Sequence, residues 1–452
     1  MGPLAHGIGG VKDLPIPLWL FYYGAALVLL LSFLALWALW KQPVLARASR
    51  GRPLPEWLER IVLSPATRVA LGTVGVGLLV LVSATALVGD TSPNDNLAPT
   101  FVYVPFWVGL ALLVAVVGNV WTALNPWRAA ADAVAWAWER TGGGWEAPFA
   151  YRERLGRWPG AVLLFAFASL ELAYSDPSDP RMLALAVYIY SAVTWLGMLA
   201  YGREPWTQNG EAFSVYFGLL SRVAPFGVRE GRVVVRWPFA DLANLDARPG
   251  TVAFVAVMLG STAFDGFSRR IVWVDFKASL IRPVGESSLE LAKIVGILTS
   301  VAGLTVFVVG LALAYLAAVW ASGAAVGYRG DLRGAFIGSL VPIALAYVIA
   351  HYFSLVLLQG QYMAPLLSDP FGFGWNLFGT ADVSPNLTFL KPNVIWYAQV
   401  AALVIGHVAG LAVAHDRAVE LFESPRRAVL SQYPMLVLMV VYTVTGLRVL
   451  SG

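Results

Sequence analysis

The sequence contains about ten apolar runs of membrane-spanning length, and they carry almost no charged side chains. A helix needs about 17–25 residues to cross the hydrocarbon core of a bilayer, and most of these runs reach that length. The pattern predicts an all-α fold, a polytopic transmembrane helix bundle with the lipid bilayer as its main partner. The predicted spans lie near residues 17–40, 68–88, 101–123, 158–175, 181–200, 250–267, 294–320, 335–358, 394–415 and 434–450.

Composition supports one integral membrane domain over residues 1–452. The chain is 58% hydrophobic and only 13% charged, whereas soluble domains average about 25% charged residues. The formal charge of +4 gives no reason to expect a nucleic-acid partner, because the basic residues cluster in loops. The chain has no cysteine, which excludes disulfides, thiolate metal sites and a cysteine nucleophile.

Three stretches leave the number of spans open. The runs at 158–175 and 250–267 are short, so each could be tilted or broken. Residues 212–228 are apolar but interrupted by Arg222, and we interpret them as an interfacial or re-entrant helix rather than another crossing.

The distribution of basic residues predicts the orientation. The loops at 41–68, 124–157, 201–249, 321–334 and 416–433 hold 22 of the 31 Lys and Arg residues. Cytoplasmic loops carry an excess of these residues, so we expect both termini to lie outside. The loop at 268–293 is discordant, because it places five basic residues on the outer side.

A few titratable residues interrupt the apolar runs, and they are the candidates for chemistry. A charged side chain at the centre of a membrane helix costs roughly 2.5–3.5 kcal/mol on insertion scales. Asp265 and Glu171 lie toward the predicted outer ends of their runs, and His351 lies in the outer third of its run. We predict that these three form a catalytic group in a cavity open to the outside. The alternatives are a surface ion pair of Asp265 with Arg269 or Arg270, and local pairing of Glu171.

Histidines give a second interpretation of the same region. His351, His407 and the external His6 could bind a divalent transition metal, since neutral imidazoles with a carboxylate suit such ions. No His-Glu-x-x-His or His-x-His spacing fixes a ligand set. His407 lies within Gly406-His-Val-Ala-Gly410, a small-residue pattern that favours close helix contact and directs the imidazole toward protein.

The predicted external loop at 359–392 is long and rich in aromatic residues, glycine and proline. Loops of this kind are often lids or binding loops, although a cap that packs on the bundle explains the composition equally well. Its polar residues are the predicted substrate-binding set: Gln359, Gln361, Tyr362, Asp369 and Asn376.

Several short motifs resemble a group of bacterial, largely actinobacterial, multi-pass membrane proteins known as fenitrothion hydrolases. The similarity runs along most of the chain and rests on these strings: Ala5-His-Gly-Ile-Gly-Gly, Asn125-Pro-Trp-Arg, Phe264-Asp-Gly, His351-Tyr-Phe-Ser with Gln359-Gly-Gln, Ser368-Asp-Pro-Phe-Gly, and Gly406-His with Ala414-His-Asp-Arg. The resemblance implies a bacterial plasma (inner) membrane protein that hydrolyses an aryl phosphotriester. It assigns no role to any residue.

Three functions therefore remain open. A membrane-embedded hydrolase would act on small apolar organophosphate-type esters, with an activated water as nucleophile. A proton- or metal-linked transporter of a small solute would use the same intramembrane acids and histidines as a relay. A scaffold protein would use the loop at 359–392 as a docking surface. No nucleotide-binding glycine motif and no Gly-x-Ser-x-Gly elbow is present.

Overall fold

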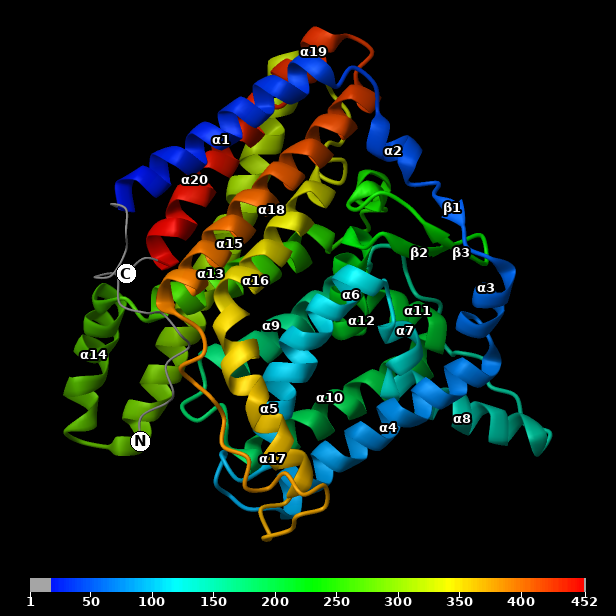
Figure 1. Ribbon diagram of the computed structural model, residues 1–452, viewed down its shortest axis with the longest axis vertical. Coiled ribbons are helices and arrows are strands. Elements are labelled where there is room, and N and C mark those ends of the chain that lie inside the picture. Colours follow the sequence, from blue (N-terminus) through cyan, green and yellow to red (C-terminus); the bar gives the residue numbers. More distant parts are fainter. Residues whose placement is uncertain (1–17, 451–452) are drawn as a thin grey trace.

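The computed structural model describes residues 18–450, and this part of the chain is mostly helical (Figure 1). Within it, nine helical segments are long and apolar enough to cross a membrane. The prediction of a polytopic helix bundle is confirmed. These segments are α1 (Leu18–Leu39), α4 (Pro65–Val88), the continuous α5 (Leu97–Phe101), η2 (Val102–Gly109) and α6 (Leu110–Val117), α10 (Pro180–Tyr201), α13 (Thr251–Ser268), α15 (Leu289–Val326), α16 (Leu340–Gln359), α18 (Pro392–Leu421) and α20 (Tyr433–Leu450).

The tenth predicted run corresponds to α9 (Trp158–Leu172), whose 15 residues fall short of the usual spanning length. The predicted outward placement of the termini stays a prediction. The connections between the long helices contain further short helical elements. They are α2 (Val44–Ala48), α3 (Glu56–Val62), α7 (Trp121–Leu124), α8 (Pro126–Arg140), α11 (Arg203–Asn209), α12 (Ala212–Leu220), η3 (Ser221–Val223), η4 (Ala240–Asn244), α14 (Ile271–Gly285), η5 (Ile337–Ser339), η6 (Gly360–Tyr362), α17 (Met363–Ser368) and α19 (Pro425–Leu430).

Two of the stretches that left the number of spans open fold in different ways. The predicted run at 250–267 forms one unbroken helix, α13. The stretch at 212–228 begins with α12, and most side chains of this helix are fully covered by neighbouring helices. Such burial excludes a helix lying on the membrane surface and leaves the re-entrant alternative. The short helix α12 thus occupies the interior of the bundle.

A small antiparallel sheet, which the sequence had not indicated, joins distant loops in the order β1-β3-β2. Its strands are β1 (Arg52–Pro53), β2 (Phe226–Arg229) and β3 (Arg232–Val235). The two residues between β2 and β3, Glu230 and Gly231, both have positive φ. This is the backbone of a tight hairpin turn, whose twist matches that of the strands it joins.

Glycines permit a close helix contact between α16 and α18. A Cβ atom at Gly406 would lie 2.8 Å from the carbonyl oxygen of Pro342, and one at Gly410 would lie 2.6 Å from that of Ser339. Real side chains do not tolerate such distances, so only glycine permits this approach. The predicted close contact is confirmed, and His407 between the two glycines is fully buried in protein.

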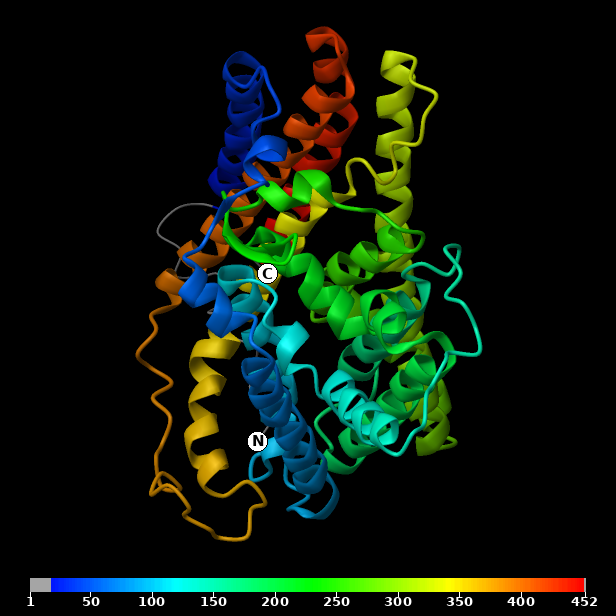
Figure 2. The same ribbon diagram turned by 90° about the vertical axis from the view of Figure 1, so that its right-hand side faces the viewer.

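The loop that follows α16 is anchored to the start of α5. Its Pro370 and Phe371 carbonyls accept backbone N–H groups of Leu97 and Asp90, at 3.1 and 2.8 Å. In Figure 1 this orange segment lies at one end of the molecule and α19 at the other. Figure 2 shows the same loop running outside α16 toward the start of α18. The loop therefore packs on the bundle at the end where α9, α13 and α16 terminate.

Candidate functional site

Three helices bring an acid or an imidazole to the same place. Asp265 lies one turn before the end of α13, and His351 lies in the second half of α16. The imidazole Nε2 of His351 is 2.6 Å from Oδ2 of Asp265, and both side chains are only 5% exposed. A short contact of this kind, shielded from water, is much stronger than the same contact on a surface.

Tyr352 connects this pair to the third predicted catalytic residue, Glu171 at the end of α9. Its hydroxyl lies 3.3 Å from Oε1 of Glu171 and 3.5 Å from Oδ2 of Asp265. The structure thus brings together the three residues that the sequence singled out for catalysis. Their catalytic role stays a prediction. The sequence did not predict a role for Tyr352, and the only feature that could have indicated one is its position next to His351.

Arg269 links the pair to the protein surface. Its Nη2 lies 3.1 Å from Oδ1 of Asp265, one helical turn away on α13. The Arg269 side chain is 38% exposed, so the buried carboxylate is one side chain away from solvent. The ion pair expected as an alternative for Asp265 is therefore present, and it coexists with the His351 contact. One oxygen of Asp265 faces a cation and the other faces the imidazole.

Two buried donors beside this cluster lack a well-formed hydrogen bond. Among residues 18–450, the buried hydroxyl of Tyr216 makes no hydrogen bond, and the buried indole Nε1 of Trp107 interacts with Tyr352 only outside normal hydrogen-bond geometry. Their rings stack at 4.6 Å, and both side chains lie close to Tyr352. An unsatisfied buried donor costs about 1–3 kcal/mol, and native proteins rarely keep one without a reason. Two of them beside an acid–imidazole pair suit a ligand with acceptor oxygens.

His407 occupies a different environment from His351. Its Nδ1 lies 2.7 Å from the carbonyl oxygen of Leu403 on its own helix. The rings of Tyr347 and Tyr442 pack against it at 6.1 and 6.2 Å, and its Nε2 has no hydrogen-bond partner within the described chain. These contacts are typical of a histidine that packs between helices.

The predicted metal site cannot be assembled from the described residues alone. Between residues 18 and 450, no three His, Asp or Glu side chains lie close enough together to hold a metal ion. His6 falls outside the described residues. The ligand set of His351, His407 and His6 therefore stays a prediction.

Two of the predicted substrate-binding residues, Gln359 and Tyr362, lie at the end of α16 and in η6, and both are partly exposed. Gln361 between them fixes the returning loop. Its side chain donates to the carbonyl oxygen of Asn386 at 3.1 Å and accepts the N–H of the same residue at 2.9 Å. This amide is used for loop structure.

The other two predicted binding residues also order the loop. Asp369 accepts the backbone N–H groups of Phe373 and Gly374, at 3.0 and 2.7 Å. Asn376 accepts the Ser368 hydroxyl at 3.0 Å. These hydrogen bonds explain how the loop after α16, which consists mainly of turns, keeps one conformation. A role in substrate binding stays a prediction for the whole set.

An apolar cavity of about 590 Å³ lies on the other side of α9 from the cluster, between α4, η2, α9 and α10. Phe167 and Leu170 of α9 and Pro105 of the π-helical turn line it. The Phe167 ring also packs against Trp107 at 4.8 Å, so one aromatic side chain separates the cavity from one of these donors. Single π-turns inside α-helices occur frequently at functional sites.

A second buried acid, Glu211, was not recognised from the sequence. It is fully buried at the start of α12, where its oxygens accept the backbone N–H groups of Phe213 and Ser214, both at 2.8 Å. The Asn125 amide donates to it at 2.9 Å, and the Tyr190 hydroxyl donates to its other oxygen. Both oxygens are satisfied, so this acid organises the interior.

The chain has no recognisable relative in three comparisons: no family model, no curated protein and no solved structure matches it.

Proposed function

We propose that the chain is a membrane-embedded hydrolase of small apolar organophosphate-type esters, in which the Asp265–His351 pair activates water. The observation that carries the proposal is the 2.6 Å contact between Oδ2 of Asp265 and Nε2 of His351, buried beside two donors that lack a well-formed hydrogen bond. A general base oriented by a carboxylate is the usual way to deprotonate water or a hydroxyl nucleophile. The resemblance to fenitrothion hydrolases points to the same reaction.

The proposed step follows from the contacts of each group. With Nε2–H donating to Asp265, a neutral His351 carries its lone pair on Nδ1, which takes a proton from water. The water oxygen forms a bond to phosphorus while the bond from phosphorus to the aryl oxygen breaks, and the aryl oxide leaves with the electron pair. The Asp265 carboxylate stabilises the protonated imidazole, which then gives the proton to the aryl oxide and so becomes neutral again. The products are a phosphodiester and a phenol.

The orphan donors have a defined place in this step. As the pentavalent transition state forms, charge builds on the phosphoryl oxygen, and donors positioned for that oxygen lower the barrier. Among the described residues the Tyr216 O–H makes no hydrogen bond, and the Trp107 N–H has only its weak contact with Tyr352. We assign them to this role. The free-energy cost of burying both donors without a good hydrogen bond would then be offset when substrate binds.

The apolar cavity supports the substrate class. Aryl phosphotriesters partition into lipid, so they can reach a site from within the bilayer. The cavity of about 590 Å³ is lined almost entirely by apolar side chains, and sites for small molecules are typically apolar with few polar groups. Substrate would pass Phe167 to reach the acid–imidazole pair.

The test is hydrolysis of diethyl 4-nitrophenyl phosphate by the full chain in lipid nanodiscs, followed as release of 4-nitrophenol. We expect His351→Gln to lower kcat by about 10²–10⁴, the usual contribution of a general base. His407→Gln is the matched control, since this buried histidine contacts no carboxylate. Equal turnover by His351→Gln and the parent, with both folded, would refute the assignment.

A second pair of variants separates catalysis from general electrostatics. Arg269→Gln removes the arginine that pairs with Asp265, whereas Arg270→Gln removes a positive charge at the next position and leaves that pair in place. We expect turnover to fall only in the first variant. If the purified protein retains one equivalent of a transition metal after treatment with a chelator, His351 would instead be assigned as a metal ligand.

Proton-linked transport is a second candidate, supported by one feature of the same site. Glu171, Tyr352, Asp265 and His351 form a contiguous series of proton-carrying groups, and such series are typical of proton-coupled transporters. Vesicles containing the protein would then take up a solute only with a proton gradient, and Glu171→Gln would abolish uptake. A protein that hydrolyses ester but moves no protons would exclude this candidate.

A further inference from the structure

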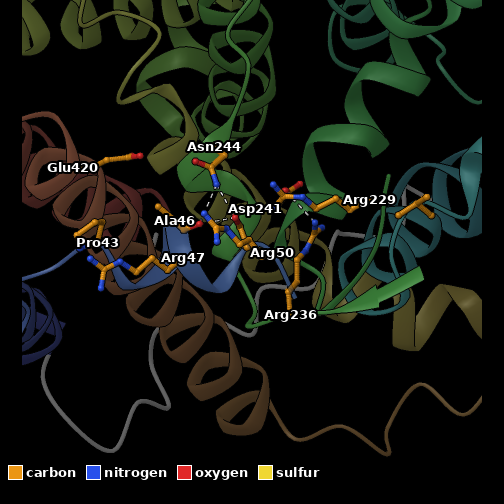
Figure 3. Close-up of a pocket in the computed structure, with 11 residues that line it drawn as sticks. Pro43, Ala46, Arg47, Arg50, Arg229, Arg236, Asp241, Asn244 and Glu420 are labelled. Carbon is orange, nitrogen blue, oxygen red and sulfur yellow. Dashed lines mark hydrogen bonds and ion pairs between the residues drawn. The ribbon is translucent and has the colours of Figure 1, made fainter. Parts of the chain in front are cut away.

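A pocket rich in arginine lies away from the candidate active site, where three loops distant in the sequence meet (Figure 3). Its volume is about 500 Å³. Arg47 belongs to α2, Arg50 to the turn that follows α2, and Arg229 to β2, while Arg236 directly follows β3. All three loops belong to the side that the sequence predicts to be cytoplasmic.

The positions of these arginines are fixed by buried contacts. Asp416 of α18 is fully buried and accepts the N–H groups of Leu45 and Ala46, at 2.9 and 2.8 Å, which holds α2 in place. Asn244 of η4 donates to Ser49 at 2.7 Å and so joins the second loop to α2. The pocket is therefore a built feature of the fold, although its lining comes from segments almost 200 residues apart.

The acids of the pocket are already neutralised. Asp241 lies between two guanidinium groups, 3.2 Å from Arg222 and 3.1 Å from Arg236. Glu420 pairs with Arg417 on its own helix at 2.5 Å. The lining acids thus leave Arg47 and Arg50 without a carboxylate partner, whereas Arg229 pairs with Glu230 at 3.8 Å.

Arg47 and Arg50 supply that uncompensated charge. Arg47 donates to the neutral amide of Gln42 at 2.6 Å. Within residues 18–450, neither Arg47 nor Arg50 forms an ion pair. Arg236 adds a guanidinium with only 7% exposure. Burial lowers the pKa of Arg236, so this cation would gain from a further anion nearby.

Apolar and aromatic side chains place the pocket at the level of lipid headgroups. It lies just beyond the end of α1, where Trp37 is exposed and Trp40 donates to Asp416. Tryptophans mark the boundary between membrane and water. Val228 on the pocket wall and the nearby Trp237 are also largely exposed, which suits contact with lipid rather than with water.

We propose that this pocket binds the phosphate headgroup of an anionic phospholipid from the leaflet on the arginine-rich side. Arg47 and Arg50 would bind the phosphate, since arginine matches its oxygens in a bidentate manner. Basic pockets between helices on this side of a membrane are suited to anionic headgroups. The tryptophans and Val228 would contact the upper acyl chains, a contribution that free phosphate cannot make.

The experiment measures binding of lipids to the full chain in a neutral detergent. Phosphatidylglycerol is compared with phosphatidylcholine of the same acyl chains, and glycerol 1-phosphate is the headgroup probe without chains. Binding is measured by native mass spectrometry and by the lipid-induced rise in Tm. We expect selective binding of phosphatidylglycerol and no binding of glycerol 1-phosphate at the same concentration.

Paired variants locate the site. The double variant Arg47→Ala with Arg50→Ala should weaken phosphatidylglycerol binding about 30-fold, which corresponds to about 2 kcal/mol at about 1 kcal/mol per basic residue. Arg426→Ala with Arg427→Ala is the matched control, because these exposed arginines of α19 do not line the pocket. All four residues are exposed, so both variants should fold.

Three outcomes would overturn the proposal. Equal losses in the two double variants would mean that lipid responds only to overall charge. Equal affinity for phosphatidylglycerol and phosphatidylcholine would exclude recognition of an anionic headgroup. Glycerol 1-phosphate binding as tightly as the lipid would assign the pocket to a soluble phosphate instead.

Discussion

Replacing Glu211 tests whether the buried acid beneath α12 holds the interior together. Glu211→Ala removes the N-cap acceptor of α12, which costs about 1 kcal/mol. It also leaves the buried donors of Asn125 and Tyr190 without their partner, at about 1–3 kcal/mol for each donor. The expected loss in the free energy of unfolding is about 3–7 kcal/mol. Glu211→Gln keeps one accepting oxygen and should lose about half as much.

The assay is equilibrium unfolding in mixed micelles of dodecyl maltoside with increasing SDS, monitored by tryptophan fluorescence. Glu204→Ala is the matched control, since this half-exposed acid makes only surface contacts, with Arg128 at 2.6 Å and with the Gln208 amide at 2.7 Å. Pairs of that kind contribute about 0–1 kcal/mol. If Glu211→Ala and Glu204→Ala unfold within about 1 kcal/mol of each other, the network around Glu211 does not carry the stability that its geometry implies.

Two further predictions concern packing and local order. Gly406→Ala should destabilise the bundle by about 1–3 kcal/mol, because the added methyl group overpacks against α16. Gly310→Ala should be neutral in the same unfolding assay, because a Cβ there would meet nothing within 4 Å. Similar unfolding midpoints for the two variants would contradict the close contact between α16 and α18. Asp416→Ala should abolish the hydrogen-exchange protection of the Leu45 and Ala46 amides, because it removes their acceptor. Unchanged protection would show that other contacts hold α2.

The fold followed from the sequence because membrane helices carry their own signal. Length and apolarity of each run suffice to identify a spanning helix, so nine of the ten predicted runs coincide with helices of spanning length. The small-residue spacing around His407 likewise predicted close packing, because the absence of side chains at Gly406 and Gly410 is local information. The three-stranded sheet escaped prediction, since β1 has only two residues and pairs with a strand 180 residues away.

The candidate site was predictable only in part, for a related reason. Asp265, Glu171 and His351 stood out because each is a titratable residue in an apolar run, and the cost of burial marks such positions. Their partners carry no such mark. Tyr352 and Trp107 are ordinary residues of a membrane helix, and their importance arises from contacts between helices that no local pattern encodes.

The two buried glutamates show how geometry can separate structural from chemical acids. Glu211 receives donors on both oxygens, including two backbone N–H groups of its own helix, so a reaction there would first have to break the start of α12. Glu171 has one long hydrogen bond, from Tyr352 at 3.3 Å, and it lies near the unpartnered hydroxyl of Tyr216. An acid whose surroundings are incompletely satisfied can change partner or protonation without unfolding a helix. The chemistry of this protein should therefore be sought at Glu171, Asp265 and His351, and removal of Glu171 should impair function more than stability.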